Sequence, residues 1–110
     1  MPVKQNPAIK ELQTIPGVGK SIAGDLINIG ITRVEQLKNK NPQKLYEHMN
    51  RYYGVKQDVC ILYVMRCAVY FASNSSHRKE QLNWWYWKDK TLNEEKPFID
   101  AMNRFLRGSA

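Results

Sequence analysis

A run of four residues, Pro16-Gly17-Val18-Gly19, restricts the fold of this 110-residue chain more than any other feature. Proline holds φ at about −65° and disfavours helix at the residue before it, while glycine adopts positive φ without a steric penalty. Both glycines can therefore take positive φ, and the chain can reverse direction sharply. We expect Val18 to lie between the segments that flank this turn.

Helical patterns stand on both sides of the turn. Residues 8–13 form the first, with Pro7 at the first helical position, and Lys20–Asn28 forms the second, with apolar residues at helical spacing. The second helix starts at the turn itself. The backbone amides of Gly19, Lys20 and Ser21 should therefore point outward without an intrahelical acceptor, an arrangement that attracts anions.

The stretch LQTIPGVGKSIAGDLI resembles the helix-hairpin-helix motif of DNA-binding proteins that lack sequence specificity. Both glycines, the valine between them and the alanine four residues on stand where that motif has them. The resemblance implies that hairpin amides, those of Gly17, Gly19 and Lys20, bind a DNA phosphate. Gly17, Val18 and Gly19 would then shape the site, and Lys20 and Ser21 would contact the phosphate.

The resemblance becomes narrower along the chain. IPGVGKSIAGDL, NIGITRVEQL, YVMRCAVYFA and WWYWKD, in this order over residues 8–90, look like the bacterial pathogenicity-locus family, some of whose members are labelled mitomycin-resistance proteins. The first part is also similar to the C-terminal domain of the competence regulator family. Both resemblances imply a compact all-α fold, and neither implies catalysis. Some helix-hairpin-helix proteins hold a monovalent cation on hairpin carbonyls, here those of Gln13, Ile15 and Val18.

Further helices are expected beyond the first two. Thr32 and Glu35 have capping-box spacing, and Asn41-Pro42 is a typical helix start. The expected helices cover residues 33–38, 42–51 with Gly54 closing it, 59–72 as the apolar central helix, and a short one from residue 78 into the aromatic cluster. The KNKN segment before Pro42 lacks a glycine-apolar-glycine turn, so we expect one phosphate-binding hairpin only.

Two features of the second half have alternative interpretations. Arg66 interrupts the apolar central helix: its head group either pairs with a carboxylate or helix C-terminal carbonyls at the surface, or binds phosphate beside the hairpin. The cluster of residues 84–87, WWYW, either covers the helical bundle or offers a stacking platform for unpaired bases. Helical spacing places Trp84 and Trp87 on one face, with Trp85 pointing away.

Composition bounds the remaining possibilities. The hydrophobic content of 43% suffices for one modest domain, and the formal charge of +7 favours a polyanionic partner. We divide the chain into a flexible terminus (1–7), the helix-hairpin-helix domain (8–90), and a linker with an amphipathic helix (91–110). That last helix, with Phe98, Met102 and Phe105 at helical spacing, should dock on its own domain or form a dimer or partner contact.

No catalytic or metal-binding arrangement is recognisable. Cys60 and Cys67 are about 10 Å apart at helical rise, too far for a disulfide, and are expected to be buried reduced thiols. His48 and His77 lack neighbouring ligands and should be solvated surface residues. No apolar stretch has the length of a signal peptide or a membrane span, which predicts a cytoplasmic protein with no membrane partner.

These observations predict a non-enzymatic protein without a cofactor or a metal, which binds the DNA phosphate backbone without sequence specificity. Lys10, Lys38, Lys40 and Lys44 would add diffuse attraction. The alternative is a protein-interaction or scaffold module with the same helical fold, in which the aromatic cluster and the C-terminal helix contact a partner protein or a second copy.

Overall fold

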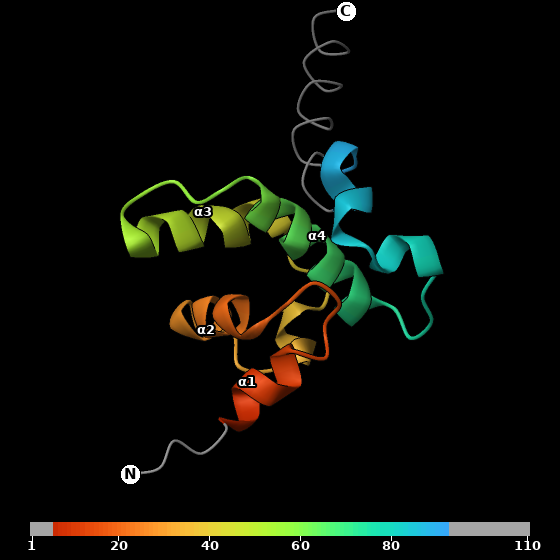
Figure 1. Cartoon of the computed structure of the whole chain (residues 1–110), viewed down its shortest axis with the longest axis horizontal. Helices are drawn as coiled ribbons and strands as arrows, with labels where there is room; N and C mark the ends of the chain where they lie inside the picture. The colour runs from red at the N-terminus through yellow and green to blue at the C-terminus, as the bar shows by residue number, and fades with distance from the viewer. Residues whose placement is uncertain (1–5, 93–110) are drawn as a thin grey trace, which may run out of the picture.

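A computed structural model describes residues 6–92, and its architecture is helical throughout that part of the chain (Figure 1). The expected all-α fold is confirmed. The elements are α1 (Pro7–Leu12), α2 (Lys20–Asn28), the 3₁₀ helix η1 (Val34–Leu37), α3 (Pro42–Tyr53), α4 (Cys60–Ser73), and the 3₁₀ helices η2 (Lys79–Leu82) and η3 (Trp84–Asp89). The amphipathic helix expected after residue 96 and most of the expected flexible N-terminus lie outside the described residues.

Helices α1 and α3 begin in the way that the sequence predicts. Asn6 accepts a hydrogen bond from the Ala8 amide at 2.8 Å, and Asn41 accepts one from the Lys44 amide at 3.1 Å, each followed by proline at the first helical position. Helix α3 ends at Gly54, whose φ of 74° is left-handed. It runs two residues further than the predicted end at residue 51 because only this glycine stops it.

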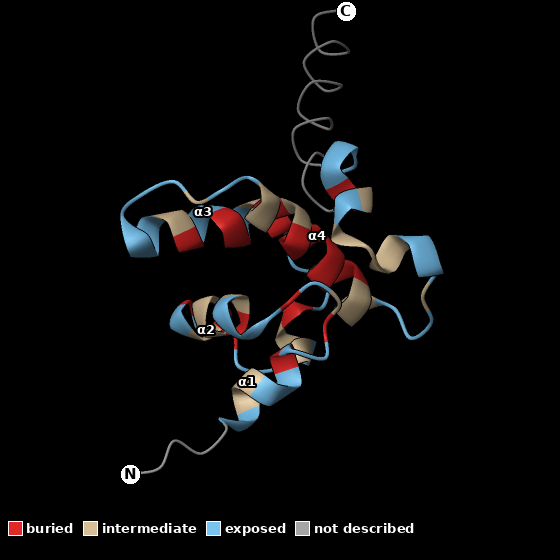
Figure 2. Cartoon of the chain, in the orientation of Figure 1, coloured by how far each residue is buried: buried red, intermediate tan, exposed pale blue. Residues whose placement is uncertain are grey.

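Helix α4 forms the centre of the molecule. Its side chains are buried on nearly every face, as the red ribbon of Figure 2 shows, and it packs against α3, η1, η2 and η3. The helix runs from Cys60, one residue later than predicted, although Val59 already has helical backbone angles and the Asp58 carboxylate accepts the Cys60 amide at 2.8 Å, as a helix cap does. Val59 itself is exposed. The predicted central core helix is otherwise confirmed.

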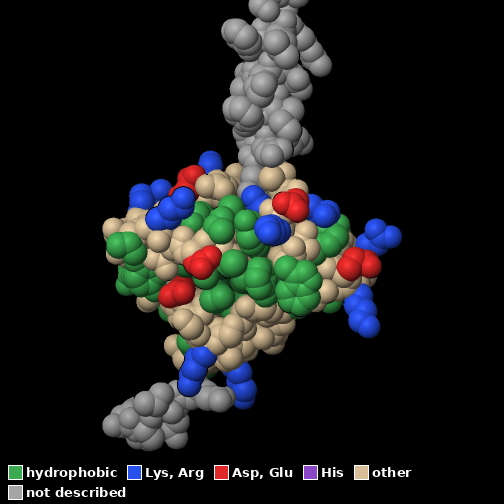
Figure 3. Space-filling model, turned by 45° about the horizontal axis from the view of Figure 1, so that its top comes forward, with side chains coloured by type: hydrophobic (Ala, Val, Ile, Leu, Met, Phe, Trp, Pro, Cys, Tyr) green, Lys and Arg blue, Asp and Glu red, His purple; other side chains and the backbone are tan. Residues whose placement is uncertain are grey.

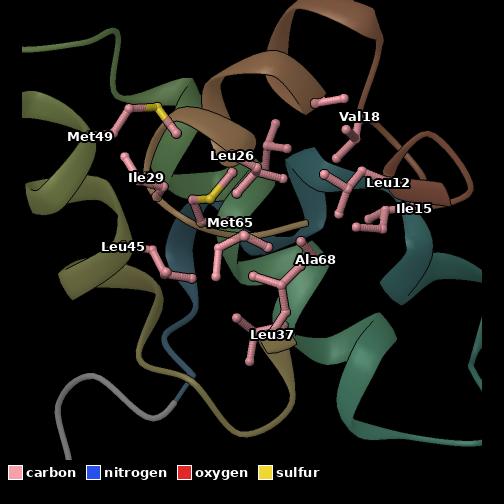
Figure 4. Packing of buried hydrophobic residues seen from close by; sticks show 14 residues of the cluster. Leu12, Ile15, Val18, Leu26, Ile29, Leu37, Leu45, Met49, Met65 and Ala68 are labelled. Atoms are coloured by element: carbon pink, nitrogen blue, oxygen red, sulfur yellow. The ribbon is translucent and has the colours of Figure 1, made fainter. Parts of the chain in front are cut away.

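Two groups of buried side chains meet on α4. The larger group joins the apolar residues of α1, the following turn, α2, η1 and α3 to one side of α4 (Figure 4), and its fully buried members include Leu12, Leu26, Leu37, Met49 and Met65. The smaller group is Cys67, Tyr70 and Trp87, where η3 covers another side of α4. The whole chain from residue 7 to residue 89 is therefore tied to one central helix.

The segment after α2 differs from its prediction. It forms the short 3₁₀ helix η1, and its start is capped by Gln36 instead of the predicted pair of Thr32 and Glu35. The Gln36 side-chain oxygen accepts the backbone amides of Thr32 at 2.7 Å and Arg33 at 2.8 Å. Arg33 is thus the N-cap of η1. The residue that closes the capping box is therefore Gln36 and not Glu35.

Arg66 has a structural role. Only 7% of the residue is exposed, and its Nη1 donates to the Trp87 carbonyl at 2.8 Å. This carbonyl belongs to the last turn of η3, so the first of the two interpretations, pairing with helix C-terminal carbonyls, is the one the structure supports. Arg66 thereby fixes η3 to α4 through a hydrogen bond within the protein.

Candidate nucleic-acid interface

The turn between α1 and α2 is built as the proline and first glycine demand. The Val18 amide donates to the Ile15 carbonyl at 3.1 Å, with Pro16 and Gly17 as the two central residues. Gly17 has φ of +86°, the left-handed value that the third position of a type II turn requires. Val18 is 5% exposed and lies with Leu12 and Ile15 in the core, as expected (Figure 4).

Gly19 departs from the prediction. Its φ is −92° with ψ of −170°, an extended conformation that any residue adopts, so the left-handed freedom of glycine is used at Gly17 alone. A β-carbon added at Gly19 would meet no atom within 4 Å. The reason is the position of Gly19: it is the N-cap of α2, where extended backbone precedes the first helical residue. Nothing in the fold itself requires glycine at this position.

The first turn of α2 presents unpaired amides. Within residues 6–92, the backbone N–H groups of Gly19, Lys20 and Ser21 meet no hydrogen-bond acceptor, and α2 has no side-chain cap. These three residues and Gly17 are exposed, while Val18 beneath them is buried. The structure therefore brings four of the five predicted site residues together on the surface and places the fifth, Val18, as their support.

Sequence reasoning missed the neighbour of this turn. Trp84 packs directly on it: the position of a β-carbon at Gly17 lies 3.2 Å from Cδ1 of Trp84. The sulfur of Cys67 lies 3.9 Å from the Pro16 carbonyl oxygen and 3.5 Å from that of Leu82. The turn, α4 and the segment leading into η3 consequently pack against one another. No local pattern announces this, because the contacting residues are far apart in sequence.

The cysteines and histidines give the site no reactive group. Burial raises the pKa of the Cys67 thiol to about 11, which keeps it protonated. Cys60, predicted to be buried, is only partly so, and both thiols are free. His48 is exposed as predicted, but His77 is not a solvated surface residue: it stacks on Phe71 and its Nε2 lies 2.9 Å from that residue's carbonyl oxygen.

The described residues contain neither a cluster of metal-ligating side chains nor a helix suited to a membrane. Among residues 6–92, no group of three or more His, Cys, Asp or Glu side chains stands in a position to hold a metal ion. In the same range, no helix combines the length and the apolar character that a membrane crossing needs.

The KNKN segment differs from the turn at Gly17, because the Asn39 amide donates to the Ser73 hydroxyl at 2.8 Å.

Comparison with known proteins shows to which family the chain is related. The family described as Cdd1, pathogenicity locus, matches residues 5–93. The mitomycin resistance protein McrB of Streptomyces lavendulae is 35% identical over 77 residues, which cover 70% of each chain. No solved structure matches significantly. The chain is thus a member of the Cdd1 pathogenicity-locus family.

Proposed function

We propose that this protein binds the phosphate backbone of DNA, without sequence specificity and without catalysis, through the hairpin between α1 and α2. The observation that carries the proposal is the exposed run Gly19, Lys20 and Ser21, whose amides have no acceptor within residues 6–92. Amides and the positive end of a helix dipole attract a phosphate, and the Lys20 ammonium adds a full charge. The packed residues beneath the turn hold these groups in place.

Charge and shape support phosphate contact over base reading. The formal charge of +7 attracts a polyanion, and Lys10, Lys38, Lys40 and Lys44 are all exposed on segments outside the hairpin. Phosphate contacts position a protein on DNA but carry no sequence information. The hairpin offers the start of a helix to a ligand, not a helix face with side chains for a groove, so we expect no sequence choice. A DNA ligand also agrees with the predicted cytoplasmic location.

The alternative function, a protein-interaction module, has one observation in its favour. Several large apolar side chains are exposed, including Tyr52, Val55, Val59 and Trp85. Figure 3 shows hydrophobic side chains in a band across one face, with lysines and arginines around it and several acidic side chains among them. A protein partner would cover such a band. The charged edges fit a polyanion as well, and the unpaired hairpin amides have no role in this alternative.

The proposal is tested by fluorescence anisotropy with labelled duplex DNA over a series of salt concentrations. The wild type is compared with Lys20→Glu, and Lys56→Glu is the matched control, because it changes the net charge equally. Lys56 lies in the loop between α3 and α4, away from the hairpin (Figure 1). We expect Lys20→Glu to weaken binding about tenfold at low salt, the size of a lost charge-assisted contact.

The salt dependence gives a second readout from the same titrations. Losing one phosphate contact should flatten the plot of log affinity against log salt by about 0.9 for Lys20→Glu. Lys56→Glu should leave the slope unchanged and weaken binding about twofold or less, since solvent screens distant charges. Equal affinities for the two variants would show that only net charge matters. No binding at any salt concentration would refute the proposal and leave the protein-interaction alternative.

A further inference from the structure

One tryptophan of the aromatic cluster remains outside the core. Trp87 is 4% exposed and Trp84 is partly buried, whereas Trp85 is 59% exposed. The reason is the geometry of η3, since side chains three residues apart share a face of a 3₁₀ helix. Trp84 and Trp87 therefore face the rest of the protein, and Trp85 shares the outer face with Lys88, which is also exposed.

The exposed ring lies next to the hairpin. Trp84 contacts Gly17, and the ring centres of Trp84 and Trp85 are 5.7 Å apart in an edge-to-face arrangement. One intervening ring thus separates Trp85 from the turn at Gly17, which leads directly into the unpaired amides of α2. A DNA strand advances about 3.4 Å per nucleotide, so a strand whose phosphate sits at the hairpin reaches Trp85 within a few nucleotides.

The charges around Trp85 decide what kind of molecule fits there. Arg78, Lys79, Lys88 and Lys90 surround the aromatic cluster in sequence and are all exposed, against two acidic residues, Glu80 and Asp89. A flat ring that shares its face with Lys88 complements a nucleotide, whose base stacks and whose phosphate pairs with the ammonium group. A second copy of this chain would instead bring like charges together, because each copy carries a formal charge of +7.

We propose that Trp85 stacks on an unpaired base of the DNA strand held at the hairpin. This inference rests on the proposed function and narrows its substrate: duplex DNA with a single-stranded overhang or gap is preferred over uninterrupted duplex. Bases within a duplex are already stacked on their neighbours, so only an unpaired base has a free face for the indole. Stacking requires no sequence choice, because every base has such a face.

The test compares two labelled probes, a blunt duplex and the same duplex with a short thymine overhang, in the anisotropy assay. Wild type should bind the overhang probe more tightly. Trp85→Ala should lose about 5- to 100-fold in affinity for this probe, the range of one base–aromatic stack, and remain within about twofold for the blunt duplex. Trp85→Phe should retain much of the preference. Because Trp85 is exposed, both variants should fold like wild type, which thermal melting verifies.

Tyr52→Ala is the matched control. Tyr52 is 54% exposed, similar to Trp85, but it stands near the end of α3 and not beside the hairpin (Figure 1). Its removal should change neither affinity. If Trp85→Ala binds the overhang probe as tightly as wild type while Lys20→Glu loses binding, the stacking inference fails and the proposed function stands. If no variant and no wild type binds either probe, both fail. Dissociation of a dimer by Trp85→Ala would also overturn the inference, by assigning the ring to self-association.

Discussion

The two glycines of the hairpin are required for different reasons. Gly17 combines φ of +86° with the close approach of Trp84, so a β-carbon there meets both backbone strain and a packed ring. Gly19 has extended backbone and open space where a β-carbon would point. In the proposed function that open space is where a phosphate approaches the amides of α2. Glycine at position 19 then serves the ligand, while glycine at position 17 serves the fold.

Alanine substitutions separate these two roles. Gly17→Ala should lower the free energy of unfolding by about 1–3 kcal/mol, through left-handed strain and displacement of Trp84. Gly19→Ala should change it by less than about 1 kcal/mol, because the lower entropy of the unfolded chain offsets the poorer N-cap. Urea denaturation measures both. The DNA affinity should nevertheless fall for Gly19→Ala, because its methyl group occupies the approach to the amides.

Either half of this prediction can fail on its own. A Gly17→Ala variant as stable as wild type would contradict the tight contact between the turn and Trp84. A Gly19→Ala variant that binds DNA like wild type would mean that phosphate does not approach the start of α2. Ser21→Ala is a useful comparison, since it leaves every backbone amide in place and removes only the hydroxyl that would contact the phosphate.

Among the secondary-structure elements, the sequence correctly predicted those whose start and end depend on residues nearby in the chain. The bounds of α3 follow from Asn41-Pro42 and Gly54, which act within one turn of the chain. The segment that forms η1 depends on a distant group: the Val34 amide donates to the Glu11 carboxylate of α1 at 2.7 Å. No pattern within residues 33–38 contains that contact, so the sequence predicted a helix there but not its 3₁₀ form. The cap was missed for a different reason: Gln36 is a local residue, but Glu35 has the capping-box spacing from Thr32 and was predicted in its place.

The candidate site also has features that depend on nearby residues and features that depend on residues far apart in the sequence. The turn and the amides of α2 could be predicted because proline, glycine and helical periodicity act locally. The packing of Trp84 on Gly17 could not, since it joins residues from opposite ends of the domain through α4. Spacing predicted that Trp85 points away from Trp84 and Trp87, but its exposure and its nearness to the hairpin are known only from the fold.

Helices α2 and α3 are joined by a polar contact that responds to pH. The Tyr53 hydroxyl donates to the Asp25 carboxylate and accepts from the Asn28 side-chain amide at 2.9 Å. The hydrogen bond to Asp25 raises the pKa of Tyr53 above its usual value of 10.0. Because the pKa of Tyr53 is raised in the folded state, the contact contributes its full stabilisation below the unfolded-state pKa of 10.0. This stabilisation is lost as the pH rises through the higher folded-state pKa.

Two substitutions test this contact. Asp25→Asn should lower the pKa of Tyr53, which ultraviolet absorbance of the tyrosinate detects. Tyr53→Phe should cost about 0.5–1 kcal/mol of stability at neutral pH, because the contact is solvent-exposed, and the difference from wild type should disappear at strongly alkaline pH. Tyr52→Phe serves as the control on the neighbouring ring. A Tyr53→Phe deficit that is constant with pH would assign the loss to packing instead of the hydrogen bond.

For the whole molecule, α4 is the connection between the two groups of buried side chains. Met65, Ala68 and Val69 belong to the larger group, and Cys67 and Tyr70 to the smaller one. Trp84 packs against both groups. Loss of either group therefore removes contacts from the other, and small domains built in this way usually unfold in one cooperative transition. The hairpin and the aromatic cluster stay at a fixed separation only if this domain unfolds in one such cooperative transition.

The positions of the tryptophans allow a direct measurement of that cooperativity. All three tryptophans lie in η3, so tryptophan fluorescence reports the docking of η3, whereas the far-ultraviolet circular dichroism of residues 6–92 comes mainly from their four α-helices. We expect the two thermal transitions to coincide within about 2 °C, as in two-state unfolding. Trp85→Phe sharpens the comparison, because the remaining rings are Trp84 and Trp87, which face the protein. An earlier fluorescence transition would mean that η3 leaves α4 while the hairpin persists, and Trp85 could then no longer act together with the hairpin on one strand.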